Sequence, residues 1–225
     1  MNIEKSRFNM IEQQIRPWNV LDAAVLELLS VVKREDFVPP AHKALAFADL
    51  EIPLLDSSED AMRLGQCMLA PRLEARLLQD LAVQSTETVL EIGAGSGFMA
   101  ALLAHRAHRV VSLEIDPTLA KMARDNLRKA GIQNAEVRQA DGALPAPAEG
   151  RYDAILMSGS VAEIPHTLLA LLQVGGRLAA IVGEDPVMRA TIVTRTSDTE
   201  FSTVQSWDTV APRLLNFPEP SRFTF

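Results

Sequence analysis

A glycine-rich turn between a predicted strand and a predicted helix constrains this chain more than any other feature. The run Val-Leu-Glu-Ile-Gly-Ala-Gly-Ser-Gly-Phe at residues 89–98 places Gly93, Gly95 and Gly97 at alternate positions, behind Glu91. Glycine permits a sharp turn and lets a ligand lie against the main chain, because it has no Cβ. A dinucleotide-binding turn would carry its third glycine one residue later. We therefore expect a different ligand here, with an ordinary strand-to-helix turn as the alternative.

The same glycine spacing resembles the cofactor loop of class I S-adenosylmethionine-dependent methyltransferases. The resemblance implies S-adenosylmethionine as the cofactor and S-adenosylhomocysteine as its product. The cofactor-binding residues that we predict in this loop are Glu91, Gly93, Ala94, Gly95 and Gly97.

An acidic residue, Glu114, ends the next predicted strand at residues 109–114. In a strand–helix–strand unit, an acid about twenty residues beyond the first glycine lies at the neighbouring strand tip and can bond both ribose hydroxyls. The alternative is a favourable charge at the start of the next helix, but Asp116 and Pro117 suit that position better. We therefore predict cofactor contacts from Glu114 and Ile115.

A third strand pattern, at residues 135–139, also ends at an acidic residue. Asp141 follows it, next to Gly142, and could accept a hydrogen bond from an adenine amino group. Three acidic or glycine-rich strand ends in series are much less expected by chance than one. We therefore add Asp141 and Gly142 to the predicted cofactor site.

From residue 88 onward, strand patterns alternate with helical patterns. This alternation predicts an α/β fold with a doubly wound, mostly parallel sheet covered on both faces, which binds ligands at the carboxyl ends of its strands. The last two strand patterns flank a short turn and predict an antiparallel hairpin at the sheet edge. The expected strands are residues 88–92, 109–114, 135–139, 152–157, 177–182, 190–196 and 202–210, and the expected helices are residues 96–106, 117–130 and 164–172.

The first 83 residues have mainly helical periodicity, with helices expected at residues 2–14, 21–31 and 73–83. We expect residues 1–83 to form an N-terminal helical extension with an acceptor-side segment, and residues 84–225 to form the cofactor-binding core of one compact domain. Polar and proline-rich composition predicts exposed loops at residues 56–62 and 143–150.

Composition argues against several classes of protein. Cys67 is the only cysteine, so no intrachain disulfide can form, and a reducing, cytoplasmic location is expected. No apolar run approaches the length of a membrane span, so we expect no membrane association. The net charge of −7 disfavours a nucleic-acid partner. The four histidines are scattered, so no metal site is predicted.

Five further segments carry a more specific pattern. They are Val-Lys-Arg-Glu-Asp-Phe-Val-Pro at 32–39, Ala-Phe-Ala-Asp-Leu-Glu-Ile-Pro-Leu at 46–54, Tyr-Asp-Ala-Ile at 152–155, Ile-Pro at 164–165 and Gly-Gly-Arg-Leu at 175–178. With the glycine turn, they resemble the protein-L-isoaspartate O-methyltransferase family over residues 10–210. The resemblance implies a seven-stranded sheet with a reversed edge hairpin, S-adenosylmethionine as the cofactor, and methylation of isoaspartyl residues in damaged proteins.

The acceptor motif departs from this family. Members typically carry Gln-Thr-Ile-Ser, a variable residue and Pro, and the two hydroxyls help to hold the substrate carboxylate. The aligned run here is Gln-Cys-Met-Leu-Ala-Pro-Arg at residues 66–72, so Cys67 and Leu69 replace both hydroxyls. The preceding loop at residues 55–64 is longer than usual, and residues 210–214 match the family's Phe-Val-Pro-Leu only weakly.

The acceptor candidates therefore keep their alternatives. Arg72 could grip a carboxylate with its guanidinium, or could be a solvated residue at a helix start. Cys67 could be a nucleophile, or a small buried apolar residue. A carboxylate acceptor is ionised at neutral pH and needs no general base, so the lack of an obvious catalytic histidine does not oppose methyl transfer. The candidates for the acceptor pocket are Gln66, Cys67, Leu69, Arg72 and Ser158.

Three functions stay open at this point. The first is a carboxyl methyltransferase whose partner is a polypeptide with an isoaspartyl carboxylate. The second is a methyltransferase of the same fold with a small-molecule acceptor. The third is a non-catalytic cofactor-binding protein. The sequence does not decide the oligomeric state.

Overall fold

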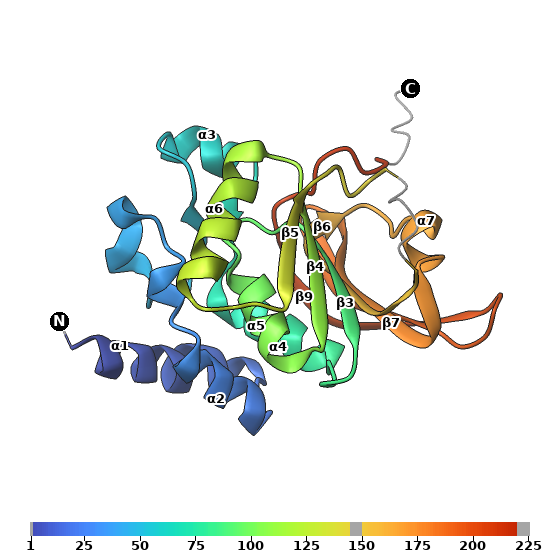
Figure 1. Cartoon of the computed structure of the whole chain (residues 1–225), viewed down its shortest axis with the longest axis horizontal. Coiled ribbons are helices and arrows are strands. Elements are labelled where there is room, and N and C mark those ends of the chain that lie inside the picture. Colours follow the sequence, from blue (N-terminus) through green and yellow to red (C-terminus); the bar gives the residue numbers. More distant parts are fainter. Residues whose placement is uncertain (1, 145–149, 220–225) are drawn as a thin grey trace.

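The computed structural model describes residues 2–144 and 150–219, which fold around a seven-stranded sheet (Figure 1). The strands are β3 (Thr88–Ile92), β4 (Arg109–Glu114), β5 (Ala135–Gln139), β6 (Tyr152–Val161), β7 (Leu172–Glu184), β8 (Val187–Arg195) and β9 (Phe201–Thr209). Their order is β5-β4-β3-β6-β7-β8-β9. Strands β3 to β7 are parallel, and β8 is antiparallel to β7 and to β9.

This topology confirms the predicted fold class, including the antiparallel hairpin of β8 and β9 at the sheet edge. The chain order reverses at β3, since β4 pairs with one side of β3 and β6 pairs with the other. In open α/β sheets the ligand crevice lies at the carboxyl ends of the strands beside such a reversal. The fold therefore places the tips of β3, β4 and β6 around one location.

Three helices cover one face of the sheet (Figure 1): α4 (Pro71–Leu81), α5 (Phe98–Arg106) and α6 (Pro117–Lys129). α6 begins where predicted, because the Asp116 side chain accepts hydrogen bonds from the first free backbone N–H groups of the helix. The other face packs against the short α7 (His166–Leu169), whose Leu168 and Leu169 share a core with Leu90 and Ile155. Both faces are covered, as the alternating pattern predicts.

Two predicted elements differ from the structure. The helix expected at residues 164–172 is a single turn, because Leu172 already pairs with Tyr152 and begins β7, which extends to Glu184. The loop expected at residues 56–62 contains a short exposed helix, α3 (Ser58–Arg63). It forms because the Ser57 side chain accepts a hydrogen bond from the Asp60 N–H and caps the helix.

The N-terminal segment is mostly helical, as expected. Its elements are α1 (Ile3–Met10), η1 (Ile11–Ile15), η2 (Arg16–Trp18), α2 (Ala23–Val31), η3 (Arg34–Asp36), η4 (Pro40–Leu45), and a two-stranded sheet of β1 (Ile52–Pro53) and β2 (Cys67–Met68). The predicted helix at residues 2–14 changes from α to π geometry at Ile11. Side chains of this segment share one core with α4 and α5, and a boundary at residue 83 stays a prediction.

The loop predicted at residues 143–150 lies largely outside the described residues, since residues 145–149 are not described. Among the residues that are described, no helix is both long and apolar enough to cross a membrane.

Candidate functional site

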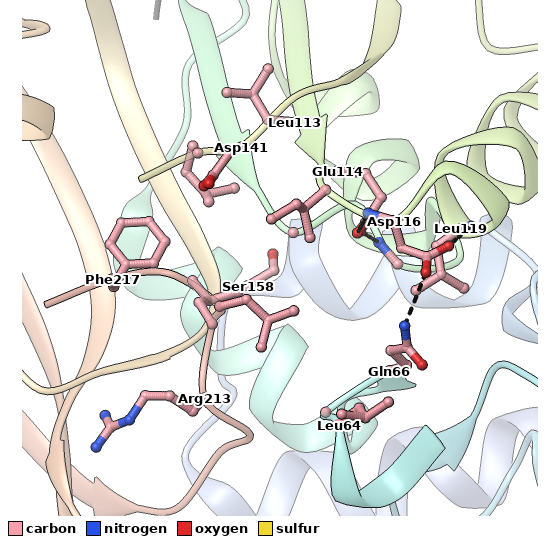
Figure 2. Close-up of a pocket in the computed structure, with 18 of the residues that line it drawn as sticks. Leu64, Gln66, Leu113, Glu114, Asp116, Leu119, Asp141, Ser158, Arg213 and Phe217 are labelled. Atoms are coloured by element: carbon pink, nitrogen blue, oxygen red, sulfur yellow. Dashed lines mark hydrogen bonds between the residues drawn. The ribbon is translucent and has the colours of Figure 1, made fainter. Parts of the chain in front are cut away.

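A pocket lies at the carboxyl ends of the central strands (Figure 2). One side, here called the strand wall, consists of the tips of β3, β4, β5 and β6 with the turns that follow them. The other side, here called the loop wall, consists of residues 64–67 before α4 and residues 213–217 after β9. Segments far apart in the sequence therefore enclose one site.

The pocket contains most of the predicted cofactor residues. Gly93, Gly95, Glu114, Ile115, Asp141 and Gly142 line it, and so do the acceptor candidates Gln66, Cys67 and Ser158. Five predicted residues are not in its lining: Glu91, Ala94, Gly97, Leu69 and Arg72.

The glycine turn presents main chain to the pocket. Gly93 has a φ of +92°, which side chains rarely adopt, and a Cβ at this position would lie 3.1 Å from Leu214 Cδ2. Gly97 has a different role, because its Cβ would lie 3.1 Å from the Ala123 backbone, so this glycine lets α5 pack closely against α6. Ala94 is buried in the core.

Glu114 connects the glycine turn to the tip of β4. Its Oε2 accepts a hydrogen bond from the Gly95 N–H at 2.8 Å, and its Oε1 accepts one from the Asp116 N–H at 3.0 Å. Burial raises the pKa of this carboxyl, while the backbone donors favour its ionised form. A carboxylate has about four acceptor positions, so acceptor positions remain for a ligand beside the backbone donors.

Glu91 lies behind the strand wall and is fully buried. It accepts hydrogen bonds from Ser112 Oγ at 2.5 Å and from Ser158 Oγ at 2.9 Å. Burial raises the pKa of Glu91 to about 7, against the opposing effect of the two hydroxyl donors. Glu91 therefore orients the Ser158 hydroxyl at the pocket rather than facing the pocket itself.

Asp141 lies at the tip of β5 and contacts the segment that follows β9. Its Oδ1 accepts a hydrogen bond from the Ala143 N–H at 2.9 Å, and its Oδ2 accepts one from Asn216 Nδ2 at 2.7 Å. Gly142 packs tightly on β3, since a Cβ there would lie 2.5 Å from Ile92 Cγ2.

Gln66 joins the loop wall to the strand wall (Figure 2). Its Nε2 donates to Asp116 Oδ2 at 3.1 Å. Cys67, the next residue, has its Sγ 3.9 Å from Glu51 Oε2. Burial and the neighbouring acids Glu51 and Glu74 raise the pKa of the thiol to about 12, which favours the apolar reading of Cys67 over a nucleophilic role.

Leu69 and Arg72 face away from the pocket. The Leu69 side chain is buried in the core, and its carbonyl accepts a hydrogen bond from Arg34 Nη2 at 2.7 Å. Arg72 pairs with Asp49 and stacks over the Trp18 ring at 4.3 Å. The guanidinium of Arg72 is therefore already occupied outside the pocket.

The sequence reasoning gave no site role to the C-terminal strap, defined here as residues 211–217. The strap is anchored to β6, where the Ser160 N–H donates to the Pro212 carbonyl at 2.7 Å and the Leu214 N–H donates to the Ser160 carbonyl at 2.9 Å. Leu214 packs against Gly159, whose Cβ would lie 2.8 Å from it. Two features of the sequence could have indicated the strap. They are Gly159, which has no side chain although it lies in a buried strand, and the run at residues 210–214, which matches the family weakly.

No group of three or more His, Cys, Asp or Glu residues that could hold a metal ion occurs within residues 2–144 and 150–219.

Comparisons with known proteins identify the family that this chain resembles. The family model for protein-L-isoaspartate(D-aspartate) O-methyltransferase matches residues 5–210. The protein-L-isoaspartate O-methyltransferase 1 of Syntrophobacter fumaroxidans is 40% identical over 184 residues, 82% of each chain. The protein-L-isoaspartate O-methyltransferase of a Bradyrhizobium species is 40% identical over 197 residues, 87% of this chain and 86% of its own.

The chain belongs to the protein-L-isoaspartate O-methyltransferase family. This membership confirms the predicted resemblance and the predicted class of enzyme, a methyltransferase. The fold agrees as well. A Plasmodium falciparum chain described as a protein-L-isoaspartate O-methyltransferase, in complex with S-adenosyl-L-homocysteine, superposes with a TM-score of 0.77. The match covers 95% of this chain and 98% of that chain, at 18% identity.

The departure from this family at residues 66–72 stays a prediction from the sequence. Of the two positions that lack the family's hydroxyls, Cys67 lines the pocket, whereas the Leu69 side chain does not. The hydroxyl that does line the pocket belongs to Ser158, on the strand wall. The rest of the loop wall combines the apolar residues Leu64, Leu214, Leu215 and Phe217 with two polar ones, Gln66 and Arg213.

Proposed function

We propose that this protein binds S-adenosylmethionine in the pocket and transfers its methyl group to the side-chain carboxylate of isoaspartyl residues in damaged proteins. Membership of the family supports the reaction, and the observation that carries the cofactor assignment is Glu114. This carboxylate lies at a strand tip, lines the pocket, and is bonded to the glycine turn through the Gly95 N–H. When bound, the cofactor supplies a methyl group on a sulfonium that can be displaced in line.

The residues of the strand wall fit such a cofactor. The free acceptor positions of Glu114 suit two ribose hydroxyls, and Asp141 suits an adenine amino group, since both are acceptor-only groups when ionised. The main chain at Gly93 and Gly95 can lie against the ligand without an intervening Cβ. These residues would hold the cofactor at the strand wall, on the side of the pocket that faces the loop wall.

The acceptor side of the proposal rests on orientation and exclusion of water. An isoaspartyl carboxylate has an ordinary pKa near 4, so it is already a nucleophile at neutral pH and no residue has to remove a proton. Ser158 Oγ donates its only proton to Glu91 at 2.9 Å, so it can donate to a substrate carboxylate when Glu91 is protonated and itself supplies the hydrogen bond between the two side chains. The apolar loop wall would keep water from the reacting atoms.

One observation favours a second candidate, a methyltransferase with a small and largely apolar acceptor. The loop wall carries leucines and Phe217 but neither of the family's two hydroxyls. Its donor side chains, Gln66 and Arg213, already bond Asp116 and the pair Gly183 and Glu219, so few free donors face a carboxylate. Incubation with labelled S-adenosylmethionine and either an isoaspartyl peptide or a metabolite extract separates the two candidates. Tight cofactor binding without turnover on any acceptor would instead identify a non-catalytic protein.

The proposal includes a cytoplasmic location and a polypeptide partner. A single buried thiol is compatible with a reducing compartment, and damaged proteins in that compartment would supply isoaspartyl groups. Fractionation of cells that express the tagged protein tests the location independently of the chemistry.

A further inference from the structure

A second groove lies between α4 and the end of β9, apart from the cofactor pocket. Both tryptophans of the chain, Trp18 and Trp207, line it. Arg72 and Arg76, one helical turn apart on α4, line it as well, together with Val210. Nothing in the proposed methyl transfer uses this groove.

The groove opens at the same edge of the sheet as the cofactor pocket. α4 precedes β3 and begins at the carboxyl edge, and β9 runs parallel to β7 and ends there. The two sides of the groove also continue directly into the loop wall. Val210 lies three residues before Arg213, a span of at most about 10 Å. A polypeptide with one side chain in the pocket would therefore reach the groove with residues a few positions away.

Arg76 has the chemistry of an anion site. Its guanidinium carbon lies 4.5 Å from the Trp207 ring centroid, and no described residue forms a hydrogen bond or ion pair with it. The Nε atom of Arg76 is buried, so the two terminal NH₂ groups are the donors that can grip both oxygens of a carboxylate. Arg72 is stacked in the same way over Trp18, but Asp49 already occupies it.

The acids near the groove have other partners. Asp208 pairs with Arg189 at 3.0 Å, and Asp80 accepts a hydrogen bond from Trp207 Nε1 at 2.7 Å. Neither lies within ion-pair distance of Arg76. Among the described residues of the groove, Arg76 is thus the cation that lacks an anionic partner.

We propose that Arg76 and Trp207 form a subsite for an acidic side chain of the polypeptide substrate, a few residues from the isoaspartyl group. The occupant is a glutamate or aspartate of the substrate, because a carboxylate matches the free donors of a stacked guanidinium. The inference rests on the proposed function, since it takes a polypeptide as the substrate.

Calorimetry with peptides tests the subsite without requiring turnover. Each peptide carries one isoaspartyl residue and glutamines, with a single glutamate moved through the five positions on either side. The protein is saturated with S-adenosylhomocysteine. Peptides with the glutamate at one or two adjacent positions should bind about three- to tenfold more tightly than the all-glutamine peptide. Arg76→Gln should remove this ratio, and Arg76→Lys should keep part of it.

The matched control is Arg106→Gln. Arg106 lies in the last turn of α5, at the opposite edge of the sheet, and has no ion pair with a described residue, so this variant should keep the full ratio. Equal binding of all peptides by the wild type, or a ratio that survives Arg76→Gln, would overturn the subsite. Methyl transfer to the all-glutamine peptide is measured separately. Its absence alongside an intact binding ratio would count against the proposed function and leave the subsite in place.

Discussion

Two buried carboxylates, Glu91 on β3 and Glu114 on β4, lie on neighbouring paired strands but contact different groups. Glu114 lines the pocket and accepts two backbone N–H groups. Glu91 lies behind it and accepts two serine hydroxyls. The first is therefore placed to bind a ligand, and the second to position Ser158. This difference leads to separate predictions for the two residues.

Glu114→Gln should weaken the binding of S-adenosylmethionine by about ten- to a hundredfold. The amide would set an N–H group against the Gly95 or Asp116 N–H and remove a charged acceptor, at a cost of about 1.5–3 kcal/mol. Calorimetry measures the affinity. Glu136→Gln is the control, since Glu136 is an exposed β5 residue bonded to Arg109 and Arg138. Equal affinity in wild type and Glu114→Gln would contradict the cofactor assignment.

Glu91 should make the folded protein less stable as the pH rises. Burial raises its pKa from 4.5 to about 7, so between these values the folded protein keeps a proton that the unfolded chain has released. Its contribution to the free energy of unfolding thus falls across that window, by up to about 3 kcal/mol, and is constant above it.

Glu91→Gln mimics the protonated carboxyl and should remove this pH dependence. The free energy of unfolding of the variant minus that of the wild type should be about 3 kcal/mol larger at pH 8 than at pH 5. Urea unfolding at both pH values measures the difference. Glu74, whose pKa burial raises to about 8, stays in both proteins and acts in the same direction. The Glu91 charge also raises the pKa of Glu74, so the comparison measures Glu91 together with this coupling. An unchanged difference at the two pH values would mean that Glu91 is already ionised at pH 5.

At the scale of elements, the acceptor side of the proposed function rests on the two segments of the loop wall, residues 64–67 and the strap. Cys67→Thr places a hydroxyl at the pocket and should raise kcat/KM for an isoaspartyl peptide about tenfold, because a hydrogen bond to a charged group contributes about 1.5–3 kcal/mol. Cys67→Val has the same shape without the hydroxyl and is the matched control. Equal rates for the two variants would exclude this position from acceptor binding.

Leu69→Ser should act on stability instead. The Leu69 side chain is buried in the core, so serine leaves a cavity and a buried hydroxyl. We expect a loss of about 2–4 kcal/mol in the free energy of unfolding, measured by urea titration. A gain in isoaspartyl turnover without loss of stability would show that Leu69 faces the acceptor after all.

The strap should control how fast the cofactor leaves. Asn216→Gly removes the hydrogen bond to Asp141 and tolerates the φ of +63° at this position. Cofactor dissociation, followed by stopped flow, should accelerate about three- to tenfold. Gln205→Ala removes an exposed amide from β9 and should leave the rate unchanged. A rate unaffected by Asn216→Gly would mean that the strap does not restrain the bound cofactor.

The strand tips were predictable from the sequence, whereas the loop wall was not. Glycine spacing and acid spacing are local signals, and Gly93, Glu114 and Asp141 do meet at one pocket. The strap comes about seventy residues after Asp141 in the chain and reaches it by tertiary packing, which no local pattern reports. The same limit applies to Arg72, since its partners Asp49 and Trp18 are distant in sequence.

At the scale of the whole molecule, one sheet edge carries both the pocket and the Trp207 groove. The alternation of strands and helices predicted that edge correctly. It did not predict that α7 is a single turn, because the apolar residues that follow it, from Leu172 onward, join β7 rather than the helix. The proposed function depends on this edge, because there the strand wall, which would bind the cofactor, faces the loop wall, which would receive the acceptor.

The most direct test of that account is transfer of a labelled methyl group from S-adenosylmethionine to a pair of peptides that differ only in isoaspartate against aspartate. The account predicts a base-labile methyl ester on the isoaspartyl peptide and none on its aspartyl partner, with transfer lost in Glu114→Gln at limiting cofactor. The absence of any ester on the isoaspartyl peptide, with cofactor bound and with Cys67→Thr equally inactive, would contradict it.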